Sequence, residues 1–206
     1  MGNYLMLNDK KIALTDEQVR EIEKSFGFNR TYLSDIAVGE TFKIGDYEFI
    51  VLEHSEETTA IILKKLLIES IQFGEDNNDF RDSDCDVRRE LEKFAIKIGA
   101  IVGEENLIEH EVDLTSDDGL DDYGVARVKM SLLTSELYRK YVRILDKHKL
   151  DAWWWLITPH STPTHKNADW VKCVSPGGRF GYGYYFNFNR GVRPFCILKS
   201  NIFVSK

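Results

Sequence analysis

Apolar positions change their spacing several times along the chain, and each change predicts a different element. Residues 1–14 contain two short apolar runs joined by "NDKK", which is typical of a β-hairpin. Thr15 then stands three residues before Gln18, the spacing of a capping box, and apolar residues at helical spacing follow over residues 19–26. Residues 1–30 are therefore predicted to form a small hairpin-helix extension, with "NRTYLSD" as its linker.

The chain from Leu33 onward is predicted to form one domain, residues 33–206. In its first part, apolar and polar residues alternate over residues 42–51, with a Gly-Asp turn at 45–46. The whole segment, from Leu33 through "TTAIILKKLLI", is expected to be a meander of three short antiparallel strands.

Two later segments place apolar residues three or four apart, which predicts two amphipathic helices. The first is "DFRDSDCDVRRELEKFAIKIG", with Ser83 as its expected N-cap, and the second is "SLLTSELYRKYVRILDKH", capped by Thr134. The residues expected to face the core are Val87, Leu91, Phe94, Ala95 and Ile98 in the first helix, and Leu137, Tyr141 and Ile144 or Leu145 in the second.

The last fifty residues show strand patterns with glycine between them and no helical period. The run "SPGG" predicts a tight turn between two strands. Pro194 is expected at the start of the strand "VRPFCIL" or on a sheet edge, because proline cannot donate to a ladder. Strands, then two helices, then strands is the order of an α+β fold with short antiparallel sheets.

The run "DAWWWLITPHS" places three tryptophans in succession. In a strand, Trp153 and Trp155 share one face and Trp154 takes the other. We expect Trp153 and Trp155 to lie in the core, where each ring buries about 150–250 Å². Trp154 is expected under the helices or at the rim, and a binding role for one of the three rings stays open.

Composition narrows the class of protein. The formal net charge of −7 argues against an extended nucleic-acid surface, which needs clustered Lys and Arg. The sequence contains no apolar run long enough to cross a membrane and no recognisable signal peptide, so a cytoplasmic location is expected. Three cysteines without a CxxC pair predict reduced thiols and no structural zinc.

The run "DAWWWLITPHS", with "NRGVRPFCILKS" some thirty residues later, resembles the bacterial and phage domain of unknown function DUF6273. The segment "DFRDSDCDVRRELE" resembles the part of that family before its first helix. The resemblance covers roughly Leu33 to Ser205. It implies a C-type-lectin-like fold of the formylglycine-generating-enzyme branch, which includes the variable proteins of diversity-generating retroelements, and it leaves open that this chain is itself diversified.

In those variable proteins the ligand-facing residues lie between the tryptophan strand and the final strand. The equivalent stretch here is His160 to Arg190, which is rich in tyrosine and asparagine, as antibody paratopes are. The alternative for this stretch is a solvated hairpin. The candidate binding residues are His160, Thr164, His165, Lys166, Asn167, Trp170, Arg179, Tyr182, Tyr184, Tyr185, Asn187, Asn189 and Arg190.

Other charged positions have structural interpretations. Arg193, between apolar neighbours, is expected to be paired with a carboxylate or to satisfy backbone carbonyls. The acidic loop "DLTSDDGLDDYG" is expected to be a solvated turn, with calcium binding over residues 113–122 as the alternative. We expect no metal site and no cofactor.

The sequence therefore predicts a non-enzymatic binding protein of bacterial or phage origin. Its expected ligand is a protein or a glycan, recognised through the C-terminal loops and strand. Two alternatives remain. One is a phage inhibitor or anti-defence protein that acts through acidic faces at residues 76–86 and 113–122. The other is an oxidase of the formylglycine-generating type that uses Cys173 and Cys196, although both lie in apolar strand contexts.

Overall fold

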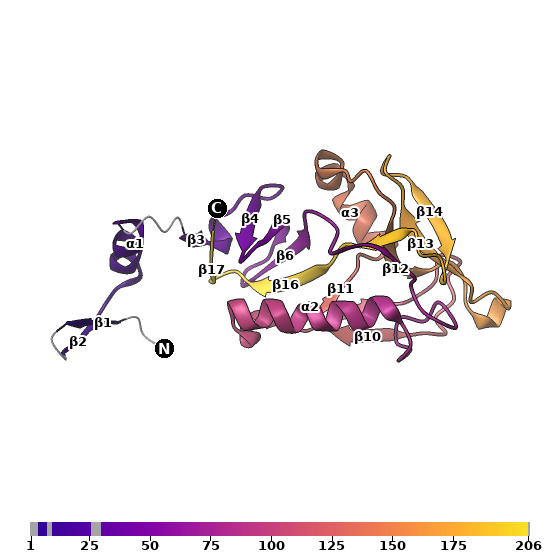
Figure 1. The fold of residues 1–206 in the computed structure, drawn as a ribbon, viewed down its shortest axis with the longest axis horizontal. Helices are drawn as coiled ribbons and strands as arrows, with labels where there is room; N and C mark the ends of the chain where they lie inside the picture. Colours follow the sequence, from indigo (N-terminus) through magenta and orange to yellow (C-terminus); the bar gives the residue numbers. More distant parts are fainter. Residues whose placement is uncertain (1–3, 8–9, 26–29, 206) are drawn as a thin grey trace.

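The structure is a computed structural model that describes residues 4–7, 10–25 and 30–205. It consists of an N-terminal extension and a larger body, which lie apart in Figure 1. In the body, helices and sheets are mixed as the sequence predicted, so the fold class is α+β. None of the helices described is long and apolar enough to cross a membrane.

The N-terminal extension has the predicted hairpin and helix. Its elements are β1 (Tyr4–Leu7), β2 (Lys10–Ala13) and α1 (Asp16–Ser25). The capping box is present, because Thr15 N donates to Gln18 Oε1 at 2.9 Å and Gln18 N donates to Thr15 Oγ1 at 3.3 Å. The predicted helix stop at Gly27 and the apolar Phe26 lie outside the described residues.

The larger sheet has eight strands, built around the predicted meander. The meander is confirmed as β4–β5–β6, and Gly45 adopts the positive φ of 57° that its turn requires. In sheet order the strands are β11 (Met130–Ser131), β16 (Phe195–Lys199), β6 (Thr58–Leu63), β5 (Tyr47–His54), β4 (Thr41–Ile44), β17 (Phe203–Ser205) and β3 (Arg30–Tyr32), with β8 (Leu107–Ile108) also pairing with β16. The separate pair β9 (His110–Asp113) and β10 (Val125–Val128) flanks the acidic loop.

The second sheet has five strands, and four of them come from the C-terminal segment. In sheet order they are β14 (Phe180–Tyr184), β13 (Trp170–Val174), β12 (Trp154–Pro159), β15 (Arg190–Val192) and β7 (Ile68–Ile71). The "SPGG" turn joins β13 to β14, as predicted, and Pro194 directly precedes β16. Most pairs are antiparallel, but β12 and β15 run parallel.

The body contains the two predicted helices, α2 (Asp86–Val102) and α3 (Ser135–Leu145), and short 3-10 turns η1 (Leu33–Asp35), η2 (Glu104–Asn106), η3 (Asp146–His148) and η4 (Pro163–His165). Thr134 caps α3 as expected, since its Oγ1 accepts from Leu137 N at 3.1 Å. The prediction that Ser83 is the N-cap of α2 is wrong. Ser83 belongs to a turn in which Cys85 N donates to Asp82 O, so the helix starts two residues later, with Cys85 at the N-cap position.

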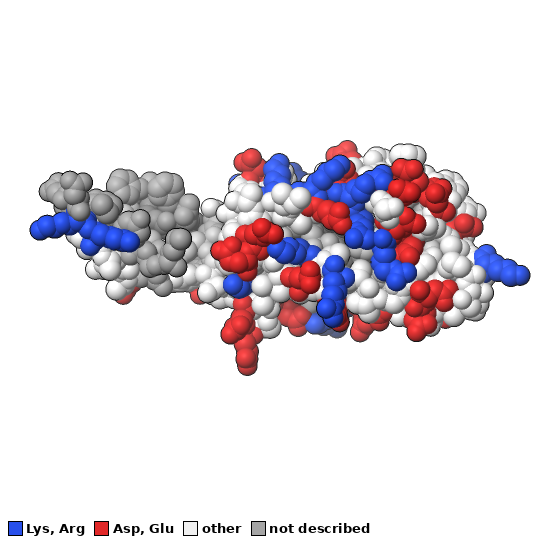
Figure 2. Space-filling view, turned by 90° about the horizontal axis from the view of Figure 1, so that it is seen from below, with Lys and Arg blue, Asp and Glu red and all other residues white. Residues whose placement is uncertain are grey.

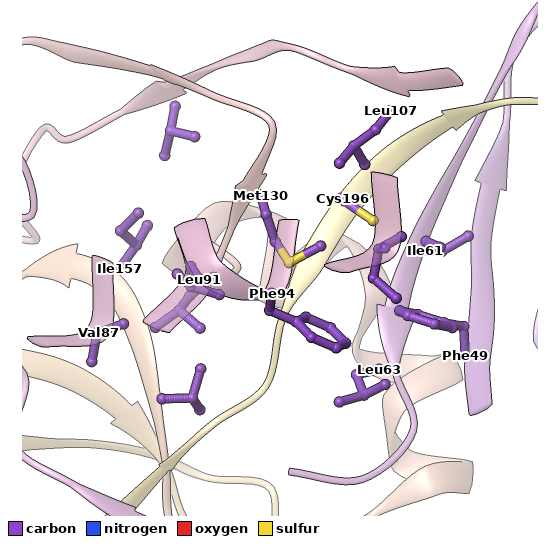
Figure 3. Packing of buried hydrophobic residues seen from close by; sticks show 14 of the residues in the cluster. Phe49, Ile61, Leu63, Val87, Leu91, Phe94, Leu107, Met130, Ile157 and Cys196 are labelled. Atoms are coloured by element: carbon purple, nitrogen blue, oxygen red, sulfur yellow. The ribbon is translucent and has the colours of Figure 1, made fainter. Parts of the chain in front are cut away.

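Two hydrophobic cores lie on opposite faces of the sheets. In β5, Phe49 and Val51 belong to the α2 core, whereas Ile50 and Leu52 belong to the α3 core. Figure 3 shows Leu91 and Phe94 of α2 packed near Phe49, Ile61 and Cys196 from the larger sheet. Figure 1 shows α2 and α3 on opposite sides of the sheets. Strands covered on both faces explain the near-continuous apolar runs of β5 and β6.

The tryptophan run divides between the same two cores. Trp155 is fully buried in the α2 core, and Trp154, 2% exposed, lies in the α3 core. The expectation that Trp153 is also a core residue is wrong, because its side chain is 38% exposed. Trp153 immediately precedes β12. Its ring lies over Gly181, where a Cβ would be 2.7 Å away, and its ring centre is 5.4 Å from the Arg190 guanidinium.

Arg193 satisfies backbone carbonyls, one of the two expected roles. Its Nε donates to Leu63 O at 2.9 Å, and its Nη2 donates to Lys64 O at 3.2 Å and to His148 O at 3.3 Å. The guanidinium also lies 5.3 Å from the ring centre of Trp154. Burial lowers the pKa of Arg193 to about 10, so the side chain still carries its charge at neutral pH.

The body should fold without the extension. Arg30 already pairs with Ser205 in β3–β17, so the body begins at Arg30 rather than at Leu33. We expect that a chain lacking residues 1–29 unfolds cooperatively, with a free energy of unfolding within about 1 kcal/mol of the full chain, because the two core clusters, as far as the side chains are described, include none before Leu33. Urea unfolding followed by circular dichroism checks this. A molten or insoluble product would show that the extension completes the core.

Candidate functional site

A row of aromatic rings crosses the face of the β13–β14 hairpin. We call it the aromatic ridge and define it as His160, Trp170, Tyr182, Tyr184 and Phe186. Tyr182 and Phe186 are about half exposed, at 52% and 50%. Phe188, 63% exposed, follows in the same segment. An exposed group of large rings on one face is typical of an interaction site.

Each ring of the ridge contacts the next. His160 stacks on Tyr182 with ring centres 5.1 Å apart, and Tyr182 meets Trp170 edge to face at 5.1 Å. Trp170 lies 3.6 Å from Tyr184, which stacks on Phe186 at 5.1 Å. The rings hold one another in place, so the ridge is a preformed surface whose side chains have little freedom left to lose on binding.

The strand period explains why the ridge lies on one face. Tyr182 and Tyr184 share a face of β14, whereas Gly181 and Gly183 point to the opposite face. A Cβ at Gly181 would lie 2.7 Å from the ring of Trp153, and one at Gly183 would lie 2.6 Å from Arg190 Nε. The alternation of glycine and tyrosine therefore lets Trp153 and Arg190 cover one face while the tyrosines form the other.

Polar groups border the ridge where α3 approaches it. Asp117 receives a hydrogen bond from Lys172 Nζ at 3.0 Å, and Arg139 Nη2 lies 3.7 Å from the same carboxylate. Lys172 Nζ is also 6.0 Å from the ring centre of Tyr182. A groove of about 270 Å³ continues from this cluster to the start of α3 and contains Ser135, whose buried Oγ has no hydrogen-bond partner among the described residues. An apolar centre with a polar border is the usual organisation of a protein interface.

No family model, no curated protein sequence and no solved structure matches the chain.

The acidic loop is an exposed turn, as predicted, but two of its carboxylates also bind the segment that follows β12. Asp118 accepts from Ser161 Oγ at 2.6 Å and from His165 Nδ1 at 2.9 Å. Asp122 accepts from Thr162 Oγ1 at 2.6 Å and from the backbone N of Thr164 at 3.1 Å. The loop carboxylates thus fix the segment that leads from β12 to the ridge.

These hydrogen bonds depend on ionised carboxylates. Burial opposes the ionisation of Asp118, but hydrogen bonds from Ser116, Ser161 and His165 outweigh it and hold the pKa of Asp118 well below its ordinary value. Hydrogen bonds from Thr162 and Thr164 likewise lower the pKa of Asp122. A carboxylate with a lowered pKa stabilises the folded state above its unfolded pKa, and this contribution is lost as the pH falls through the folded pKa.

We therefore expect the segment around Thr164 to loosen as the pH falls below about 4, the ordinary carboxyl pKa. Hydrogen exchange of the Thr164 amide, corrected for the intrinsic effect of pH, should accelerate over that range while the amides of β5 stay protected. Asp122→Asn should accelerate the same exchange at neutral pH. Equal protection of Thr164 in both proteins at every pH would refute this role of Asp122.

The structure divides the thirteen predicted binding residues into three groups. His160, Trp170, Tyr182 and Tyr184 belong to the ridge. Thr164 and His165 bind the acidic loop, while exposed Lys166, with a positive φ of 54°, and Asn167 end the same turn. The remaining five, Arg179, Tyr185, Asn187, Asn189 and Arg190, lie in turns or on the opposite face.

Three of these residues correct the prediction. Tyr185 packs against the α2 core, because β14 ends at Tyr184 and the following residue turns inward. Asn187 and Asn189 do not share a strand face. Asn187 N donates to Tyr184 O, which closes a turn.

Arg190 is also misplaced by the prediction, since it does not lie at the rim of the ridge. Its guanidinium lies 5.4 Å from the ring centres of both Trp153 and Trp155, on the glycine face of β14.

Sequence reasoning placed Phe186 in the candidate stretch but not among the binding residues. It missed exposed Phe188, and it missed Asp117, Lys172 and Arg139 as the polar border. The pattern "YYFNF" did signal bulky residues on both faces, but not where the strand ends. The contacts between the Asp-rich loop and "STPT" join segments about forty residues apart. The available signal was the presence in one chain of an acidic loop and of a serine- and threonine-rich run, whose hydroxyl groups can donate hydrogen bonds to carboxylates.

The cysteines give no accessible nucleophile. Cys173 and Cys196 are buried in different sheets, in β13 and β16, so they do not lie on neighbouring strands as the oxidase hypothesis required. Burial raises the pKa of both thiols, with Arg190 partly opposing this for Cys173. Burial likewise raises the pKa of Cys85 to about 12. Among the described residues, no cluster of His, Cys, Asp and Glu has the arrangement of a metal site.

Proposed function

We propose that this chain is a non-enzymatic recognition protein that binds a protein partner through the aromatic ridge. The observation that carries the proposal is the continuous contact of five rings, of which Tyr182 and Phe186 are half exposed. Tyrosine, tryptophan and phenylalanine are enriched at the centres of protein interfaces, where they bury large areas at a small entropic cost.

The ring geometry favours a protein over a glycan. A sugar usually stacks its C–H face on a free aromatic face. In the ridge, one face of Tyr182 is covered by His160, and Tyr184 lies between Trp170 and Phe186. These contacts occupy part of the ring faces, which leaves a larger share of ring edges and tyrosine hydroxyl groups for a ligand. Such edges carry partial positive charge and pack well against carbonyl oxygens and aliphatic side chains of a protein.

We also propose that the body is a C-type-lectin-like domain of the kind that DUF6273 represents. Three features support this proposal. The first and last strands of the body, β3 and β17, pair with each other. Two helices lie between the strands of the sheets, and a second sheet carries the tryptophan run and the ridge. The ridge lies within the stretch from His160 to Arg190, where the variable relatives present their ligand-facing residues.

The inhibitor alternative receives less support from the charges. Asp117, Asp118 and Asp122 are engaged by Lys172, Ser161 and Thr162, so they do not form a free acidic field. In the other proposed face, Asp82 accepts from Asn77, and Asp86 accepts from Gln72. Figure 2 shows Lys and Arg interspersed with Asp and Glu on the face it presents. An interspersed surface does not imitate a nucleic-acid backbone.

A selection experiment tests the proposed function. The full chain is used to select from a displayed library of protein fragments and is probed in parallel on a glycan array. A ridge variant, Tyr182→Ala with Phe186→Ala, serves as the matched control because both side chains are about half exposed. We expect enriched protein fragments that lose binding to the ridge variant, and no glycan signal. Ridge-dependent glycan binding, or fragments that bind both proteins equally, would refute the proposal.

A further inference from the structure

The open edge of the five-stranded sheet lies beside the aromatic ridge. β14 is the last strand of that sheet, and Figure 1 shows it at the outer margin of the body. Tyr185 N donates to Asp169 O, and Ser175 N donates to Arg179 O, both across the β13–β14 pair. The backbone groups of successive residues point to alternate sides of a strand. The N–H groups of Phe180, Tyr182 and Tyr184 therefore point away from β13 into the open edge.

The sequence of β14 does nothing to block this edge. Proteins usually protect edge strands with a charge, a proline or a bulge. The strand "FGYGY" contains no charged residue and no proline. It also pairs with β13 in an unbroken register from Trp170–Tyr184 to Val174–Phe180. The edge is flat enough, and free enough of repulsion, to accept another strand.

The glycine face of β14, next to this edge, carries the positive charge of Arg190, whose guanidinium has unused hydrogen-bond donors. The Arg190 guanidinium lies over Gly183, so close that a Cβ there would be 2.6 Å from Nε. Its Nη1 donates to the Asn189 side chain, but its buried Nε has no hydrogen-bond partner among the described residues. A guanidinium has five N–H donors, so it can donate hydrogen bonds to a carboxylate from a neighbouring strand.

We propose that the edge of β14 binds an extended segment of a partner protein as an added antiparallel strand. Apolar side chains of that segment pack against Tyr182 and Tyr184 on the ridge face. An acidic side chain on the other face pairs with Arg190. The inference deepens the proposed function and rests on it, because it names the form of the partner that the ridge recognises.

The geometry specifies the pattern of the segment. Directly opposed residues of an antiparallel pair have Cβ atoms about 4.5–5.5 Å apart, and side chains alternate between the two faces. Residues next to Phe180, Tyr182 and Tyr184 therefore face the ridge, and the residue next to Gly183 faces Arg190. The segment should contain apolar residues at alternate positions, with Asp or Glu between two of them. Backbone hydrogen bonds supply affinity, and these alternating side chains supply specificity.

The probe is a displayed library of random dodecapeptides, selected on the full chain. We expect an alternating apolar consensus with an acidic residue between apolar positions. A synthetic consensus peptide is then measured by fluorescence anisotropy against Tyr182→Ala and Tyr182→Pro. Both variants lack the ring, but only proline also removes the outward N–H. We expect the proline variant to bind at least about tenfold more weakly than the alanine variant, because a backbone hydrogen bond is lost.

A second measurement does not depend on the folding of any variant. The consensus peptide is methylated at one backbone nitrogen at a time. Methylation should abolish binding at alternate residues, whose N–H groups face β14, and should have little effect at the residues between them.

The pairing with Arg190 has its own test. Arg190→Gln should weaken the binding of the acidic peptide by about tenfold, and should not weaken the binding of the same peptide with its acidic residue replaced by the matching amide.

Several results would overturn the inference. One is the absence of an enriched consensus, and another is a methylation pattern without alternation. Binding that depends on the ridge but is equal for Tyr182→Ala and Tyr182→Pro would refute the added strand and leave the proposed function intact. Sedimentation that shows a wild-type dimer, dissociated by Tyr182→Pro, would assign the edge to a second copy of the chain instead of a partner.

Discussion

Replacing Trp155 with alanine is expected to lower the free energy of unfolding by about 3–5 kcal/mol, the usual cost of deleting a large core ring. Trp155 is fully buried, its Nε1 donates to Ile71 O at 3.0 Å, and its ring meets Phe73 edge to face. The substitution would leave a cavity in the α2 core and an unsatisfied carbonyl on β7. Urea unfolding followed by circular dichroism measures the loss.

Trp153→Ala is the matched control for this prediction, because the two tryptophans share a face but not their burial. Trp153 is 38% exposed and contacts mainly Gly181 and Arg190. We expect its replacement to cost less than about 1 kcal/mol, as for most surface substitutions. Equal losses for Trp153→Ala and Trp155→Ala would show that the margin of the sheet is as well packed as its centre.

Replacing Arg193 with methionine should destabilise the body by about 2–4 kcal/mol. Methionine fills much of the same volume but leaves the carbonyls of Leu63, Lys64 and His148 without their shared donor. Each unsatisfied buried acceptor costs about 1–3 kcal/mol, and part of the total is offset because a buried charge is also removed.

Arg193→Lys separates geometry from charge in this test. Lysine keeps the charge, but its single ammonium cannot reproduce the planar arrangement of donors. We therefore expect an intermediate loss of unfolding free energy, measured under the same conditions. A methionine variant as stable as the wild type would mean that these carbonyls find water or other donors, and that Arg193 contributes no net stability.

The sequence predicts those elements whose cause is local. Thr134 caps its helix because a side chain and a backbone N–H three residues apart suffice, and the β4–β5–β6 meander follows from its alternation and one Gly-Asp turn. The tryptophan run was correctly divided between two faces. Its burial was misjudged at Trp153, because burial depends on which distant segments pack against each ring, and no local pattern records that.

The site was predicted as a stretch of chain, but not as a surface. Tyr182 and Tyr184 lie together on one face of β14, whereas Tyr185 turns into the core because the strand ends one residue earlier than the bulky pattern does. The hydrogen bonds of Asp118 and Asp122 could not be predicted, because their partners, Ser161 and Thr162, are about forty residues away in sequence. Side-chain contacts over that separation depend on the tertiary fold and leave no periodic signal.

The central claim is that the aromatic ridge is a surface for recognition and not a part of the core. The most direct measurement compares unfolding and binding for one protein, the variant with Tyr182, Tyr184 and Phe186 all replaced by alanine. We predict a free energy of unfolding within about 1–2 kcal/mol of the wild type, because these rings are 37–52% exposed. Affinity for the protein fragment selected on the wild type should fall by about a hundredfold or more, as for interface anchors. A variant that unfolds, or one that stays folded and binds with unchanged affinity, would contradict the claim.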